Sequence, residues 1–231
     1  MRATGKYYAE KLSAERLKKV YDIAPRRIEE YLNAEIDFCL QYISASDIVL
    51  ELGCGYGRAL KKIAHAAEEV YGIDISDSNL RFGKEYLKGH RNCSLFVMNA
   101  SETGFKSGVF DVVLCIQNGI SAFGIDKENL IEEAVRLTKP GGYALFSSYA
   151  EEFWNERLNW FEIQSEAGLL GKIDRNLTGE GVIVCNDGFR AGTISEREYA
   201  ELVSKTGFDV EIKTVNSSSV FLVIRKTQTA N

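Results

Sequence analysis

The stretch that decides the fold is DIVLELGCGYGRAL, residues 47–60. Its first half is a short apolar run rich in β-branched residues, which predicts a buried strand over 47–52. Glycines at 53, 55 and 57 follow, and an apolar pattern with helical spacing begins at Arg58. Strand, glycine turn and helix succeed one another without a gap. This order predicts the first half of a βαβ unit.

The same order of elements repeats along the chain. Further strands are predicted at 69–75, 94–100, 110–116 and 143–149, and helices are predicted from Asp77 and over 126–138. The residues KPGG at 139–142 are predicted to stop the second of these helices before the next strand begins. Strands that alternate with helices form parallel sheets, so we expect a doubly wound α/β fold with helices on both faces.

Elements at both ends and one long insertion complete this pattern. An amphipathic helix is predicted over 25–43, and a last helix over 195–206 precedes two strands that form an antiparallel hairpin. More than forty residues separate the fifth strand from the last helix, too many for a plain connection. The expected organisation is an N-terminal helical cap at 1–44, a core at 45–150, a lid insertion at 151–193, and a final helix and hairpin at 194–231.

Composition narrows the class of protein. The 231 residues are 45% hydrophobic and 26% charged, as in an ordinary globular protein. The chain has no apolar run long enough to span a membrane and no apolar core of a signal peptide, so we expect a cytoplasmic protein without a membrane partner. A net charge of −5 gives no sequence-wide basic footprint for a polyanion, although it leaves a local basic patch on one face open, and no nucleic acid partner is expected.

Cysteine and histidine give no sign of a metal site. The five cysteines include no C-x-x-C pair, and both histidines, His65 and His90, lie in polar stretches. We therefore expect neither a bound metal nor a disulfide framework. Cys54 and Cys115 are interpreted as small side chains near a ligand, because no base is paired with them to make a nucleophile.

The glycine turn lies where an open α/β sheet binds its ligands, at the carboxyl end of the first strand. A dinucleotide fingerprint, G-x-G-x-x-G, would place its third glycine at position 58, where this chain has Arg58. Asp74 ends the second strand, where an acidic side chain can accept hydrogen bonds from both hydroxyls of an adenosine ribose. Asp74 could instead cap the next helix, although Ser76 and Asp77 are better placed for that role.

With the pattern E-x-G-x-G-x-G at 51–57 and with Asp74, the sequence resembles the class I S-adenosylmethionine-dependent methyltransferases from about residue 45 onward. The residues FDVV at 110–113, the KPGG turn and the hairpin that starts with GF at 207 extend the resemblance. The resemblance implies S-adenosylmethionine as cofactor and S-adenosylhomocysteine as product. It also implies a mostly parallel, seven-stranded sheet in the order 3-2-1-4-5-7-6, with the last strand antiparallel.

The same resemblance implies roles for individual residues. The glycine backbone would lie under the methionine part of the cofactor, Glu51 would steady the loop and the amino group, and Asp74 would hold the ribose. Ile75 would pack on the adenine, and Asn99, where many members have aspartate, would accept from the adenine amino group. The residues predicted to bind the cofactor are Glu51, Gly53, Cys54, Gly55, Gly57, Asp74, Ile75, Asn99, Ala100, Ser101, Cys115 and Gln117.

The methyl acceptor is predicted from the segment after the fourth strand. Its residues QNGIS at 117–121 lack the N-P-P-Y pattern of enzymes that methylate adenine or glutamine nitrogens. They look more like the G-N-S segment of small-molecule N-methyltransferases, from which Gln117 and Gly119 depart. Aromatic and arginine side chains could stack on or clamp an acceptor, or simply pack the lid onto the sheet. The predicted substrate residues are Tyr8, Tyr21, Asn118, Tyr149, Trp154 and Arg190.

The leading hypothesis is an S-adenosylmethionine-dependent methyltransferase that acts on a small molecule, with nitrogen slightly favoured over oxygen. Transfer would be an in-line displacement in which proximity is the main catalytic device. No catalytic residue is assigned, because neither histidine lies near a strand end. The alternatives are an RNA or protein methyltransferase, a non-catalytic protein that binds S-adenosylmethionine and, less favoured, a nicotinamide-dependent oxidoreductase. The chain is expected to be a monomer or a homodimer.

Overall fold

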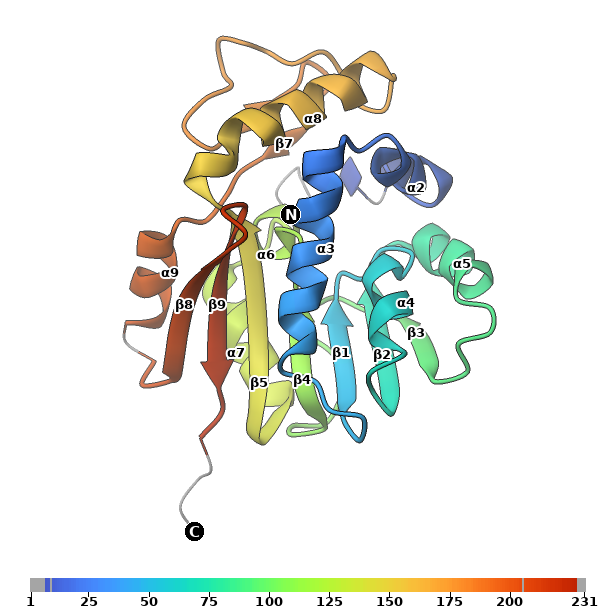
Figure 1. The fold of residues 1–231 in the computed structure, drawn as a ribbon, viewed down its shortest axis with the longest axis vertical. Coiled ribbons are helices and arrows are strands. Elements are labelled where there is room, and N and C mark those ends of the chain that lie inside the picture. Colours follow the sequence, from blue (N-terminus) through green and yellow to red (C-terminus); the bar gives the residue numbers. More distant parts are fainter. Residues whose placement is uncertain (1–6, 9, 205, 228–231) are drawn as a thin grey trace.

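The structure, a computed structural model, describes residues 7–8, 10–204 and 206–227. Its centre is a seven-stranded sheet in the order β3-β2-β1-β4-β5-β9-β8 (Figure 1). The strands are β1 (Ile48–Leu52), β2 (Glu69–Asp74), β3 (Cys93–Val97), β4 (Phe110–Cys115), β5 (Thr138–Tyr149), β8 (Asp209–Val215) and β9 (Ser219–Arg225). The first five strands pair in parallel, and β9 is antiparallel to both β5 and β8. The predicted fold class and strand order are confirmed.

Helices cover both faces of the sheet. They are α3 (Arg26–Leu40), α4 (Arg58–Ile63) and α5 (Asp77–Tyr86) on one face, and α6 (Gly119–Ala122), α7 (Lys127–Leu137) and α9 (Glu196–Val203) on the other. Successive strand residues alternate between the two cores, since Val49 packs with the first group of helices and Leu50 with the second. The burial pattern of β1, which is almost entirely enclosed, follows from helices on both of its sides.

Two segments lie beyond the carboxyl ends of the parallel strands (Figure 1). One is α2 (Glu15–Asp22), which precedes α3. The other follows β5 and comprises η1 (Glu151–Phe153), α8 (Trp154–Glu166), β6 (Ile183–Val184) and β7 (Arg190–Ala191). They touch each other through the Tyr7 hydroxyl and the Asp187 carboxylate, and through Arg16 Nη2, 3.0 Å from the Gly168 carbonyl oxygen. Together they cover the edge of the sheet at which ligands bind in open α/β folds.

Two local expectations differ from the structure. The KPGG residues do not separate α7 from β5, because β5 begins at Thr138 directly after the helix. The register with β4 shifts between Phe110 and Val112, so the four residues form an irregular start of the strand. Pro25 is the residue before α3 and not part of its first turn.

Candidate cofactor and acceptor site

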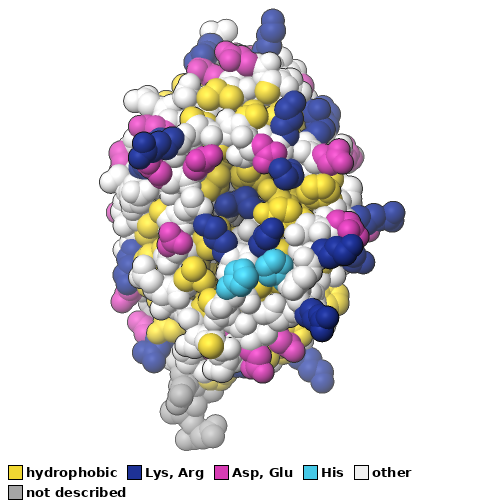
Figure 2. All heavy atoms as spheres, turned by 45° about the vertical axis from the view of Figure 1, so that its right-hand side comes forward, with side chains coloured by type: hydrophobic (Ala, Val, Ile, Leu, Met, Phe, Trp, Pro, Cys, Tyr) yellow, Lys and Arg dark blue, Asp and Glu magenta, His cyan; other side chains and the backbone are white. Residues whose placement is uncertain are grey.

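A cavity opens at the carboxyl ends of β1, β2 and β4, the point where the strand order reverses. It encloses about 1110 Å³, part of it open to solvent. Figure 2 shows a hollow on this side of the molecule, with hydrophobic side chains around it and basic side chains in and beside it. Of the predicted cofactor residues, nine line the cavity: Glu51, Gly53, Cys54, Gly55, Asp74, Ile75, Asn99, Ala100 and Gln117.

The glycine turn forms one wall of this cavity. Gly53, Gly55 and Gly57 all have positive φ, at 71°, 55° and 87°, a region that other residues adopt only with strain. A Cβ at Gly53 would lie 2.2 Å from Cζ of Phe123, so the loop leaves no room for a side chain there. Gly57 is the N-cap residue of α4 and faces Leu87 instead of the cavity.

Asp74 joins the glycine turn to the next strand. Its Oδ2 accepts a hydrogen bond from the Gly55 amide at 2.9 Å, and its Oδ1 accepts one from the Ser76 amide at 2.8 Å. Burial raises the pKa of Asp74, and these backbone hydrogen bonds oppose the shift. The cap of α5 is the Ser76 side chain, which accepts from the Asn79 amide. Asp74 is therefore free of a capping role and faces the cavity.

Glu51 and Arg58 bring opposite charges to the cavity wall, and each has an atom without a partner. Glu51 is 6% exposed, and its Oε2 has no hydrogen-bond partner. Burial raises the pKa of Glu51 to about 7, against the lowering effect of the Arg58 charge. Arg58 donates only a long hydrogen bond, 3.5 Å, to the Leu32 carbonyl oxygen, and its Nε has no partner.

These unpartnered atoms test whether the cavity fits S-adenosylmethionine. Unpaired polar atoms inside a protein are costly, so a ligand that satisfies them is favoured. An α-amino acid end supplies an ammonium group for the Glu51 carboxylate and a carboxylate for the Arg58 guanidinium. Asp74 and Ile75 would face the ribose and adenine of the same molecule. The residues present fit this cofactor.

The loop after β3 forms the opposite side of the cavity, with Met98, Asn99 and Ala100 in its lining. Asn99 Oδ1 accepts from the amide and the hydroxyl of Ser101, both at 3.1 Å, so this oxygen already closes a tight turn. Ser101 itself does not line the cavity.

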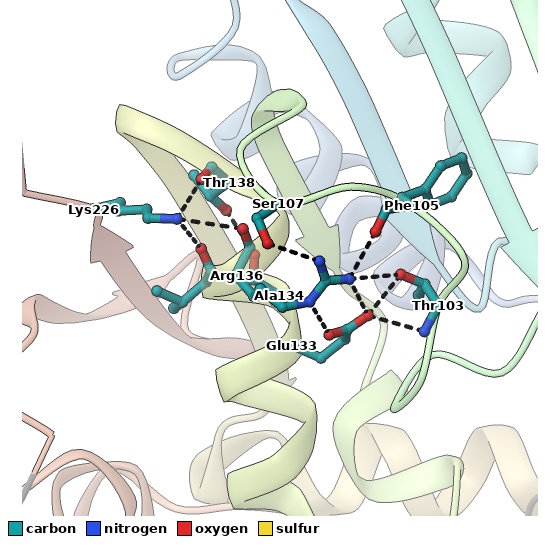
Figure 3. Close-up of polar contacts among 9 residues, drawn as sticks. Thr103, Phe105, Ser107, Glu133, Ala134, Arg136, Thr138 and Lys226 are labelled. Carbon is teal, nitrogen blue, oxygen red and sulfur yellow. Dashed lines mark hydrogen bonds and ion pairs between the residues drawn. The ribbon is translucent and has the colours of Figure 1, made fainter.

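A polar network beneath the cavity anchors this loop to α7 (Figure 3). The carboxylate of Glu133 accepts from the Thr103 amide at 2.9 Å and from its hydroxyl at 2.6 Å. Arg136 binds Glu133 and also donates to the Phe105 carbonyl oxygen at 2.9 Å. Lys226 donates to the Val135 carbonyl oxygen in the last turn of α7 at 2.9 Å and to that of Thr138, the first residue of β5, at 2.8 Å.

Gln117 lies two residues beyond the end of β4 and also lines the cavity. Its amide donates to Oε2 of Glu35 at 2.7 Å and to Oγ of Ser147 at 2.8 Å. Glu35 is fully buried, and burial raises its pKa to about 7 although hydrogen bonds oppose the shift. Cys115 lies just below and does not line the cavity. Burial raises the pKa values of the Cys115 and Cys54 thiols, so both stay protonated at neutral pH.

The predicted substrate residues do not all lie in one place. Tyr8 and Tyr21 line the cavity. Tyr149 and Trp154 line a second hollow beside the buried guanidinium of Arg157. Asn118 is 5% exposed and bonds to Ser148 and to the Gly192 carbonyl oxygen. Arg190 lies exposed on β7. The assignment of these six residues to a substrate stays a prediction.

Several lining residues were not predicted. They are mostly apolar and come from the N-terminal segment and from the loop after β4: Leu17, Phe123 and Ile125, with Tyr56, Arg58 and Met98 from the core. Within the part of the chain that the structure describes, no helix is both long and apolar enough to cross a membrane, and no three His, Cys, Asp or Glu residues gather as metal ligands.

Known proteins resemble this chain in sequence over its core. A family model described as a methyltransferase domain matches residues 49–142. The arsenite methyltransferase of Aquipseudomonas alcaligenes is 30% identical over 128 residues, which make up 50% of this chain and 36% of that protein. The ubiquinone biosynthesis O-methyltransferase of Thiobacillus denitrificans is 29% identical over 102 residues, or 43% of each chain. The matches thus span less than half the length of either relative.

The fold is shared more widely than the sequence. The solved structure of the PH0226 protein from Pyrococcus horikoshii OT3 superimposes with a TM-score of 0.65, covering 96% of this chain and 99% of that one. The two sequences are 21% identical, so this likeness concerns the fold alone.

Proposed function

We propose that this chain, whose residues 49–142 match the model of a methyltransferase domain, is a class I S-adenosylmethionine-dependent methyltransferase that transfers the methyl group to a small molecule. Nitrogen is slightly favoured over oxygen as the methylated atom. The observation that carries the proposal is the pair of unpartnered charged groups, Glu51 and Arg58, on the wall of one cavity with Asp74. Together they complement an amino acid end joined to a nucleoside.

Different residues of the cavity would hold different parts of the cofactor. The backbone of the glycine turn would carry the methionine part, with its ends held by Glu51 and Arg58. Asp74 would accept from the ribose hydroxyls, and Ile75 and Ala100 would border the adenine. When bound, the cofactor supplies a methyl group that its sulfonium already activates. The task left to the chain is to place a nucleophile in line with that methyl group and to exclude water.

The acceptor would enter from the side of Tyr8 and Tyr21, because the N-terminal segment and the insertion after β5 close over that end. We propose that residues 151–193 act as a lid for the substrate. The two relatives described above are, by their names, an arsenite methyltransferase and an O-methyltransferase of ubiquinone biosynthesis, which supports a small molecule over a polymer. Neither His65 nor His90 lines the cavity. This favours an acceptor such as a neutral amine, which needs no dedicated base before attack.

The test is turnover. Purified protein is incubated with S-adenosylmethionine labelled in its methyl group and with a fractionated pool of small metabolites, and both S-adenosylhomocysteine and labelled product are measured. We expect label in one fraction, and none with Asp74→Ala. Tight binding of the cofactor without transfer to any metabolite fraction, together with labelling of RNA or protein, would replace the small-molecule proposal.

A further inference from the structure

The backbone at the end of β4 is strained and firmly held. Gln117 and Asn118 both have positive φ, 56° and 62°, although neither is glycine. The carboxylate of Glu35 and the hydroxyl of Ser147 hold the Gln117 amide from two different elements. Ser148 and the Gly192 carbonyl oxygen hold the Asn118 side chain, at 2.9 Å each. Strain that several elements maintain together marks a position where side-chain direction matters.

The Gln117 side chain is also oriented by its neighbours. The Tyr21 hydroxyl donates to Gln117 Oε1 at 3.2 Å. The guanidinium of Arg58 lies 5.0 Å from the centre of the Tyr21 ring. The Tyr21 hydroxyl has a single proton, which it donates to Gln117. This hydrogen bond assigns the carboxamide oxygen of Gln117 to the side of Tyr21 and leaves Nε2 on the opposite side.

One atom of the Gln117 side chain has no hydrogen-bond partner. Gln117 Nε2 is buried and makes no hydrogen bond, whereas Oε1 and the backbone amide of the same residue are satisfied. Gln117, Tyr21 and Arg58 all line the cofactor cavity. A buried donor held in place without an acceptor is costly unless a ligand supplies a lone pair.

We propose that Gln117 Nε2 donates to an oxygen of the methyl acceptor, and that Gln117 is the residue that selects for this oxygen. The proposal rests on the proposed function and narrows its substrate. A neutral amine has a single lone pair, which it uses to attack the methyl group, so it cannot also accept from Gln117. An oxygen has a second lone pair. The acceptor therefore carries a hydroxyl or carbonyl oxygen that is the methylated atom or lies next to the methylated nitrogen.

The aromatic side chains that line the cavity indicate the shape of the methyl acceptor. Tyr8, Tyr21 and Phe123 line the same cavity, and flat rings bind flat ligands by stacking. The substrate class is a small planar molecule with a hydroxyl or carbonyl oxygen at its reactive edge. Gln117 was predicted as a cofactor contact. The two roles differ in one measurable respect, since a cofactor contact would change the affinity for S-adenosylhomocysteine.

The experiment uses phenol and aniline, which have the same size and ring but differ in the atom that can accept from Gln117. Protein labelled with ¹⁵N and saturated with S-adenosylhomocysteine is titrated with each probe, and the side-chain amide signals of Gln117 are identified by their loss in Gln117→Leu. We expect phenol to shift these signals and to bind about fivefold more tightly than aniline. In Gln117→Leu the preference disappears, and in Tyr21→Phe it weakens. Gln41→Leu, an exposed position at the end of α3, keeps it.

The affinity for S-adenosylhomocysteine is measured first and separates this proposal from the one on which it rests. Wild-type protein that does not bind S-adenosylhomocysteine contradicts the proposed function itself. If it binds, equal affinity for the two probes or unmoved Gln117 signals overturn the oxygen contact. A loss of affinity for S-adenosylhomocysteine in Gln117→Leu, with Gln41→Leu unchanged, also overturns it and assigns Gln117 to the cofactor.

Discussion

At the scale of single residues, the site is defined by charged groups that lack partners. Glu51 is buried with one oxygen that has no partner, and Arg58 makes one long hydrogen bond, so the hydrogen-bonding capacity of neither is satisfied within the protein. Such an arrangement is expected of a binding site and not of a structural ion pair, in which the charges would satisfy each other. The cost of burying these groups would be offset when a zwitterionic ligand end binds.

Arg58→Ala is expected to weaken binding of S-adenosylhomocysteine about tenfold, because a hydrogen bond to a charged group is lost. Binding of 5′-methylthioadenosine, which lacks the amino acid part, should not change. Titration calorimetry with both ligands measures the difference. The control is Lys61→Ala, on the same helix and outside the cavity. An equal loss for both ligands would show that Arg58 supports the fold of the loop and not the carboxylate.

Glu51 is expected to make cofactor binding depend on pH. Its pKa of about 7 means that the carboxyl group is largely neutral at pH 6 and largely ionised at pH 8. A ligand ammonium group favours the ionised form, so affinity for S-adenosylhomocysteine should rise about three- to tenfold from pH 6 to pH 7.5. Glu51→Gln should flatten this rise. A wild-type profile without slope would contradict the ammonium contact.

Glu51 should also make the stability of the unliganded protein depend on pH, but in the opposite direction to cofactor affinity: stability falls as pH rises. A carboxyl group whose pKa is raised by folding stabilises the folded state below its unfolded pKa, and this contribution is lost as pH rises through about 7. Without ligand, Glu51→Gln should therefore be more stable than wild type at pH 8, by about 2 kcal/mol or less, and nearly equal to it at pH 5. Denaturant unfolding at the two pH values measures this difference.

Two buried charged residues could have been identified from the sequence, because each lies on the apolar face of a helix. Glu35 follows Ile28 and Leu32 and precedes Cys39 at the spacing of one helix face, so a carboxylate stands on the apolar stripe of α3. Arg157 stands likewise beside Trp154, Trp160 and Phe161 in α8. A charged residue on an apolar stripe indicates a buried, partnered charge. What these residues bond to could not be predicted, because their partners come from distant strands and loops.

At the scale of elements, the turn between β1 and α4 depends on the absence of side chains. Gly53 combines a positive φ with the ring of Phe123, whose Cζ lies 2.2 Å from the position of an added Cβ. The glycine pattern was sufficient to predict the turn and its position at the sheet edge. It could not predict Phe123, which comes from the loop after β4 and closes on the turn only in the folded protein.

Gly53→Ala is expected to destabilise the protein by about 2–4 kcal/mol, because backbone strain and overpacking add. The matched control is Gly89→Ala, since Gly89 also has positive φ, 104°, but has nothing within 4 Å of an added Cβ. The control should cost about 1 kcal/mol. Thermal unfolding compares the two, and equal losses would mean that contact with Phe123 does not matter.

The loop after β3 depends in turn on α7. Glu133→Ala removes the acceptor for Thr103 and the partner of Arg136 (Figure 3), and we expect a loss of about 1–2 kcal/mol of stability with a smaller loss of cofactor affinity. Burial would raise the pKa of Glu133, but hydrogen bonds from Arg136 and Thr103 outweigh it and lower the pKa, so the stabilisation should be full at neutral pH and fade as pH falls below the ordinary pKa of a glutamate. Glu132→Ala, at the exposed neighbouring position, should change neither quantity.

At the scale of the whole molecule, the alternation of strands and helices was sufficient to predict the doubly wound sheet, and the resemblance supplied the order of its strands. The cover over the strand ends was predicted only as two separate segments. In the structure they bond to each other through Tyr7 and Asp187 and through Trp160, whose Nε1 donates to the Val20 carbonyl oxygen at 3.4 Å. Contacts between segments so far apart in sequence depend on tertiary packing, and no local pattern encodes them.

The central claim is that this cavity binds S-adenosylmethionine, and titration calorimetry of S-adenosylhomocysteine into wild type, Asp74→Ala and Asp74→Asn tests it most directly, with NADH as the competing ligand. We predict binding of S-adenosylhomocysteine to wild type, at least tenfold weaker binding to Asp74→Ala, an intermediate value for Asp74→Asn, and no binding of NADH. Binding of NADH in place of S-adenosylhomocysteine, or no binding of either, would contradict the account.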